Sequence, residues 1–135
     1  LETARPAQTE WDLKSRVGGL QDVEFIVQIL QLVAAPNGQM ISHSTTAALA
    51  ALSRSGVMMA SDAAFLSESV HLYLGIAQLL RATHGTGFDP AGASAGFTRS
   101  LVAMAGVEDM DGLRAALNTR CLKVRALFER YLAVG

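Results

Sequence analysis

Apolar residues recur at steps of three and four along most of the chain, which is the spacing of one face of a helix. The clearest series predicts a helix from Leu20 to Ala34 and consists of Val23, Ile26, Val27, Leu30 and Val33. Phe25, Ile29 and Leu32 widen this face until the helix is apolar on most sides. A helix of that kind is usually buried, so we expect it to lie at the centre of the fold.

Turn residues divide the rest of the chain into four further predicted helices. The second begins near Ser44, where Ser44 or Thr45 can cap it, and ends at Gly56; the third runs from Ser61 to Thr83. The fourth is expected from Pro90, after an Asp89 cap, to Ala105, with Phe97, Leu101 and Met104 facing inwards. The fifth is expected from Met110 to Val134, with an apolar face of Leu113, Leu117, Cys121, Val124 and Phe128, and with Arg114, Arg120, Lys123, Arg125 and Arg130 towards solvent.

This pattern predicts an all-α fold, a mostly antiparallel bundle of five helices without strands. The first, third and fifth helices should form the core. Gly75 lies in the middle of the third helix, where glycine costs about 1 kcal/mol relative to alanine. A close helix crossing is the expected reason for it.

Composition narrows the class of protein. Half of the residues are hydrophobic and the net charge is −1, with charges of both signs scattered along the chain. No basic patch is visible, which disfavours nucleic acid as a main partner. The single Cys121 is expected to be a small buried residue in a reducing compartment. We see no apolar run near the length of a membrane span and no signal peptide, so we expect a cytoplasmic protein without a membrane partner.

The beginning of the chain differs from the rest. Residue 1 is Leu, and residues 1–11 have neither a hydrophobic period nor a helix cap. We therefore expect a C-terminal piece of a longer protein, with a poorly ordered lead-in at 1–11, order beginning at Trp11, and a single helical domain at 12–135. Residues 12–14 should be extended and residues 15–19 a loop.

Residues 12–28, DLKSRVGGLQDVEFIVQ, are not explained by helix packing alone. Gly18 and Gly19 break any helix that begins upstream. Asp22 and Glu24 fall in the first turn of the next helix, where carboxylates are favoured. In one explanation the glycines only turn the chain and the acids only cap the helix. In the other, glycine amides and the charge of Lys14 line a cleft that binds phosphate groups. The spacing alone leaves both open, and the segment is not a GxxxxGKS/T loop.

The same residues resemble the DLK…GG(L/I)xDIEFxxQ segment of the glutamine synthetase adenylyltransferase family, in the nucleotidyltransferase superfamily. The matching positions are Asp12, Leu13, Lys14, Gly18, Gly19, Leu20, Asp22, Glu24, Phe25, Ile26 and Gln28, with Val23 in place of the usual Ile. A related segment occurs in the uridylyltransferases that modify PII signal proteins. In the family this segment opens a helical domain that follows a nucleotidyltransferase domain.

The resemblance implies an accessory domain of an enzyme that transfers AMP from ATP to a tyrosine of glutamine synthetase with magnesium. A second copy in such enzymes reverses the transfer by phosphorolysis under PII control. Lys14, Gly18 and Gly19 would close one side of the nucleotide cleft, and Asp22 and Glu24 would orient Lys14 or fix the helix start. The other helices would dock glutamine synthetase or the neighbouring domain.

The catalytic GSxxxxxDxD pattern of the family is absent from this sequence, so we expect the chain alone to be catalytically silent and to bind no cofactor or metal. The QTHxLP-like stretch of the deadenylylating copy is also absent, which favours the adenylylating copy.

Two alternative functions stay open. The chain could be a helical interaction module without a catalytic parent, or the equivalent domain of a PII uridylyltransferase. The latter is disfavoured because those enzymes normally continue into further domains.

Overall fold

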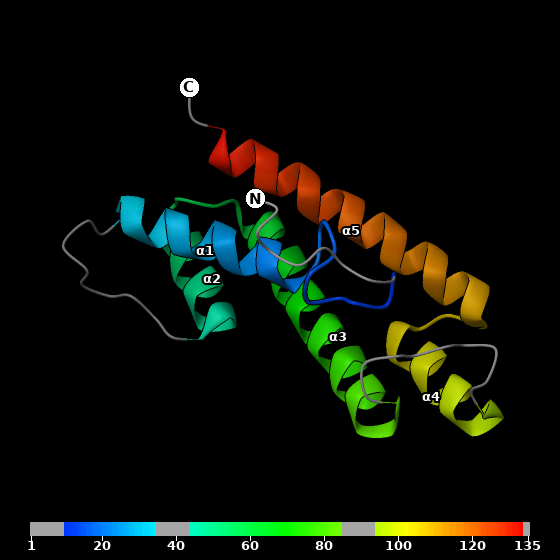
Figure 1. Cartoon of the computed structure of the whole chain (residues 1–135). Coiled ribbons are helices and arrows are strands. Elements are labelled where there is room, and N and C mark those ends of the chain that lie inside the picture. Colours follow the sequence, from blue (N-terminus) through cyan, green and yellow to red (C-terminus); the bar gives the residue numbers. More distant parts are fainter. Residues whose placement is uncertain (1–9, 35–43, 85–93, 134–135) are drawn as a thin grey trace.

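The structure is a computed structural model that describes residues 10–34, 44–84 and 94–133 (Figure 1). Its helices are α1 (Leu20–Ala34), α2 (Thr45–Arg54), α3 (Ala60–His84), α4 (Ala95–Ala105) and α5 (Met110–Leu132). The described ranges contain no strand, which confirms the predicted all-helical fold. The predicted bounds of α1 are those of the structure.

The helices enclose one core, with α5 lying along one side of the molecule, where it contacts both α1 and α4 (Figure 1). Most of the fully buried side chains come from α1, α3 and α5, and include Ile26, Leu66, Tyr73, Leu117 and Val124. The helix α2 packs mainly on α3 and contributes Leu49, while α4 contributes Leu101. Leu13, which precedes α1, is also in this core, at 1% exposure.

Side-chain caps fix the starts of α2 and α4. The amide of Ala47 donates to the Ser44 hydroxyl at 3.2 Å, as predicted for α2. At α4 the amide of Phe97 donates to the hydroxyl of Ser94, at 3.1 Å, and the backbone of Ser94 is extended. The prediction that this helix begins at Pro90 is therefore wrong, because the cap at Ser94 places its first turn at Ala95. Asp89 and Pro90 lie outside the described residues.

The basic residues of α5 lie at least partly in solvent, as predicted: Lys123 and Arg130 are exposed, and Arg114, Arg120 and Arg125 are half-buried. Each contacts another element or ring: Arg114 bonds Glu10, Arg120 bonds Ser69, Arg125 pairs with Asp22, Arg130 pairs with Asp62, and the Lys123 ammonium lies 4.2 Å from the centre of the Phe65 ring. Long side chains with apolar stems can cross from one helix to the next in this way. These contacts fasten α5 to the lead-in, α1 and α3.

The helix α1 is not enclosed on most sides, contrary to the prediction. Phe25, Leu32 and Val33 are 48%, 52% and 68% exposed. The bundle covers one face of α1 and leaves a second apolar face in solvent. On α4, Met104 is likewise exposed, and Val102 is buried instead.

The helix α3 combines two features that bear on the predictions. Its segment Ala60–Arg81 is long and apolar enough to cross a membrane by length and composition, so the prediction of no such run is wrong. Tyr73 and Ile76 of this segment are fully buried in the bundle, as expected of a core helix, so the evidence for a span is weak.

A Cβ added at Gly75 would meet the sulfur of Met104 at 3.5 Å, an ordinary contact. The packing does not require glycine there.

Candidate functional site

The candidate site is the turn formed by residues 10–19, which leads into α1. The amides of Ser15 and Arg16 donate to the carbonyl of Asp12, at 3.2 and 3.0 Å, and the Ser15 amide also lies 3.3 Å from Oδ1 of Asp12. Residues 12–14 therefore form turns and are not extended as predicted, because the Asp12 side chain and carbonyl both hold the following amides.

This turn closes on the start of α1. The amide of Leu20 donates to the carbonyl of Leu13 at 2.8 Å, and the amide of Gln21 donates to the carbonyl of Lys14 at 3.0 Å. The first amides of a helix have no partner within it. The turn supplies these partners, so it and the helix form one continuous unit.

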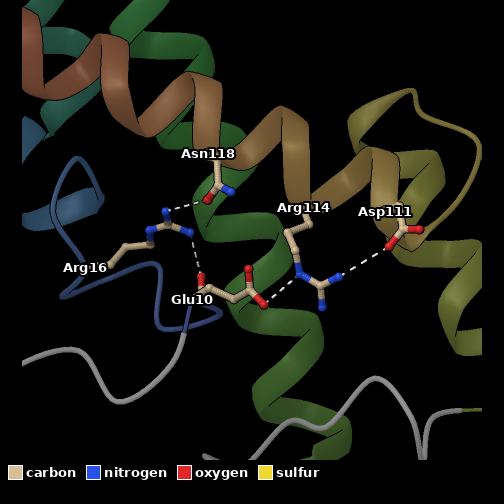
Figure 2. Close-up of polar contacts among 5 residues, drawn as sticks. All are labelled: Glu10, Arg16, Asp111, Arg114 and Asn118. Carbon is tan, nitrogen blue, oxygen red and sulfur yellow. Dashed lines mark hydrogen bonds and ion pairs between the residues drawn. The ribbon is translucent and has the colours of Figure 1, made fainter.

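The lead-in is tied to α5 by polar contacts (Figure 2). Oε2 of Glu10 accepts from Nε of Arg114 at 2.7 Å, and the carbonyl of Glu10 accepts from Arg16 at 2.8 Å. Arg16 also donates to Oδ1 of Asn118 at 2.8 Å. Trp11 is buried, which confirms it as the anchor, and the guanidinium of Arg114 lies 5.6 Å from its ring centre.

These contacts hold residues 10 and 11 against α5, in agreement with order that begins near Trp11, and the loose lead-in stays a prediction. Residues 1–9 lie outside the described residues.

Gly18 and Gly19 are explained by close approaches of the backbone. Gly18 has a φ of +81°, and a Cβ at this position would overlap the backbone of Cys121 in α5. A Cβ at Gly19 would overlap the carbonyl oxygen of Leu13. Glycine is the residue that meets both demands, a positive φ and the absence of a side chain.

The amides of both glycines are used inside the turn. The Gly18 amide donates to Oδ2 of Asp22 at 2.6 Å, and the Gly19 amide donates to the carbonyl of Arg16 at 2.9 Å. Oδ2 of Asp22 also accepts from Arg125 of α5, at 3.3 Å. Asp22 thus holds the turn and joins it to α5. In this arrangement neither glycine amide points at a ligand.

A buried hydroxyl completes the contacts of Gly18. The Tyr73 hydroxyl donates to the carbonyl of Gly18 at 2.9 Å and lies 3.3 Å from the sulfur of Cys121. Burial and the hydrogen bond with Cys121 raise the pKa of Tyr73 above its ordinary value. Tyr73 is fully buried, so it acts in the fold as a neutral hydrogen-bond donor. Cys121 is buried, as predicted.

The structure therefore brings three of the five predicted site residues together and gives them structural contacts: Gly18, Gly19 and Asp22. Lys14 belongs to the same turn but is exposed, and Glu24 is half-buried in the first turns of α1. Within the described residues no group of three or more His, Cys, Asp or Glu side chains could hold a metal ion. Of the two cations in the turn, Arg16 is bonded to Glu10 and Asn118, and Lys14 is exposed.

Sequence reasoning missed the residues that hold the turn from outside, above all Tyr73 and Arg125. Each lies in a regular helix, about fifty and one hundred residues from its partner in the turn. The excess of arginine on a predicted core helix is the available signal, because a half-buried arginine can reach a partner on another element.

Comparison with known proteins gives relatives over nearly the whole chain. A family model described as GlnD PII-uridylyltransferase matches residues 2–132. Three similar proteins are named bifunctional glutamine synthetase adenylyltransferase/adenylyl-removing enzyme. That of Rhodopseudomonas palustris (strain BisB5) is 36% identical over 123 residues, 90% of this chain and 12% of the relative. That of Xanthobacter autotrophicus is 37% identical over 124 residues, which are 90% of this chain and 12% of the relative.

The third, from Rhizobium meliloti (strain 1021), is 35% identical over 138 residues, 100% of this chain and 14% of the relative. The chain thus spans about an eighth of the length of the curated relatives that it matches. No solved structure matches.

Proposed function

This chain belongs to the GlnD PII-uridylyltransferase family, and from this premise we propose its function. We propose that the chain is a five-helix accessory domain of a larger enzyme that transfers AMP from ATP to a tyrosine of glutamine synthetase. The observation that carries the proposal is the match of 90–100% of this chain to enzymes named glutamine synthetase adenylyltransferase. The relatives are far longer than the match, so the transfer chemistry, with ATP and magnesium, is assigned to their other domains.

The role of this domain in the proposal is to present Lys14 at the edge of the nucleotide cleft. Gly18, Gly19 and Asp22 fix the turn on α5, and the turn carries Lys14 on its exposed side. A lysine ammonium is a mobile point charge suited to phosphate groups. Glu24, one turn into α1, would orient Lys14. The remaining helices would contact glutamine synthetase or a neighbouring domain.

A second candidate is the equivalent domain of a PII uridylyltransferase, with PII protein and UTP as substrates. The description of the matching family model supports it, whereas the names of the three relatives support adenylylation. A third, an interaction module without a catalytic parent, fits the structural roles of the glycines equally well.

The test is an assay of the complete product of the gene that encodes this chain, with and without residues 12–135. One reaction contains glutamine synthetase, ATP and magnesium, and a parallel reaction contains PII protein, UTP and magnesium. AMP transfer only when the domain is present supports the proposal. UMP transfer to PII moves the assignment to the second candidate, and no transfer in either reaction favours the interaction module.

Lys14→Ala in the complete product tests the proposed role of the turn. A hydrogen bond to a charged group contributes about 1.5–3 kcal/mol, so we expect adenylylation to fall roughly tenfold or more. The thermal midpoint should stay unchanged, because Lys14 is exposed. Lys123→Ala is the matched control, since Lys123 is an exposed lysine of α5 that lies over Phe65. Equal activity in the two variants would show that Lys14 does not act at the nucleotide cleft.

A further inference from the structure

The helix α1 has a second apolar face that the bundle does not cover. The ten residues that follow Glu24 in this helix include no charged side chain. Ile26, Val27 and Leu30 face the core and are buried. On the other side Phe25, Leu32 and Val33 are 48–68% exposed.

These exposed positions form one continuous stripe. Gln21, Phe25, Gln28 and Leu32 follow the steps of four, three and four that place residues above one another on a helix, and each of them is exposed. We call them, with Val33, the outer face of α1. At Phe25 this face continues onto α5, where the ring of Phe128 stacks on that of Phe25 with 5.8 Å between the ring centres.

A helix at the surface of a protein normally carries charged residues on the side that faces water. Exposed apolar side chains that gather on one face are typical of interaction surfaces. The outer face of α1 alternates glutamine amides with apolar side chains and carries no charge of its own, and the nearest described cation is Arg125, over the Phe128 ring. It therefore suits a partner surface that is mostly apolar.

We propose that the outer face of α1 packs against another domain of the same polypeptide. This rests on the proposed function, in which the chain is one domain of a longer enzyme. The matches take up only 12–14% of the relatives' length, so most of such a polypeptide lies outside these residues and is available to cover the face.

The carbonyl of Lys14 accepts from the amide of Gln21, the first residue of the stripe. The turn with Lys14 therefore stands at one end of the outer face. A single domain that packs along the face reaches this turn as well, which joins the docking surface to the proposed nucleotide cleft.

The test is photocrosslinking in the complete gene product, with p-benzoylphenylalanine in place of Phe25. We expect crosslinks within one polypeptide to peptides outside residues 1–135. The same group at Leu122, which is 74% exposed on α5, is the control and should give at least tenfold less of this product. Crosslinks between two copies, or none above the Leu122 control, would overturn the proposal.

A charge placed in the face gives a second readout. Leu32→Glu should reduce the crosslink from position 25 at least tenfold, whereas Leu122→Glu should leave it unchanged. Both side chains are exposed, so both variants should keep the helical circular dichroism of the parent. An undiminished crosslink in Leu32→Glu contradicts the proposed packing.

The crosslink is read without regard to activity. If the product crosslinks as expected but modifies neither glutamine synthetase nor PII, the proposed function is refuted and the proposed interface is supported. If it transfers AMP but crosslinks only between copies, the proposed function is supported and the interface is refuted.

Discussion

Replacing Gly18 by alanine separates the effect of a positive φ from the effect of a close backbone approach. Gly18 and Gly56 have the same φ of +81°. A Cβ at Gly18 would overlap the backbone of Cys121, whereas a Cβ at Gly56 would meet nothing within 4 Å. The obstacle at Gly18 is helix backbone and cannot rotate away, so the turn must move off α5.

The difference between the two variants follows from these surroundings. Alanine in the left-handed region costs about 1 kcal/mol at either site. At Gly18, overpacking adds roughly 1–3 kcal/mol, and displacement of the Gly18 carbonyl from the Tyr73 hydroxyl adds about 1 kcal/mol. We therefore expect the free energy of unfolding to fall by roughly 3–5 kcal/mol in Gly18→Ala and by about 1 kcal/mol in Gly56→Ala.

Urea unfolding of both variants, followed by circular dichroism, measures this difference. The slopes of the unfolding transitions should agree, so that the midpoints report stability. If Gly18→Ala is destabilised no more than Gly56→Ala, the close approach to α5 does not constrain residue 18, and the structural explanation of this glycine is refuted.

Three further changes test the packing. Burial raises the pKa of Tyr73 above 10.0, so at high pH the folded chain keeps a proton that the unfolded chain loses. The free energy of unfolding should therefore be full below pH 10 and fall above it. Tyr73→Phe should reduce that fall in urea titrations from pH 8 to pH 11. Gly75→Ala should raise stability by about 1 kcal/mol, since the added Cβ meets only Met104 at ordinary distance; a lower thermal midpoint would show that the crossing is closer. Arg120→Ala should cost about 1–2 kcal/mol by urea unfolding, since it leaves a buried serine hydroxyl without its donor, while the exposed control Arg99→Ala should change stability by less than about 0.5 kcal/mol.

The elements that could be predicted from the sequence are those set by local signals. The bounds of α1 follow from the glycine pair before Leu20 and the end of the apolar period at Ala34. The start of α4 could not be predicted in the same way. Asp89 followed by Pro90 predicts a start at residue 90, whereas in the structure the helix begins after the cap at Ser94.

The contacts of the site are set by tertiary structure and leave no local signal. Asp22 was correctly placed in the first turn of α1, but its partner Arg125 is 103 residues away. A glycine pair predicts a turn, and the turn is there. Residue 18 must lack a side chain because the backbone of Cys121 lies against it. The local sequence around residue 18 cannot show that α5 packs this closely against the turn.

The contacts of the turn also decide which variants can report on function. Gly18, Gly19 and Asp22 are required by the fold whether or not a nucleotide binds nearby, because they let the backbone approach and hold the turn on α5. Loss of activity in Gly18→Ala would follow equally from displacement of the turn and from damage to a cleft. Among the described residues, the side chain of Lys14 is exposed and makes none of these contacts. A change in activity at Lys14, with the fold intact, is therefore evidence about the cleft that the glycines cannot provide.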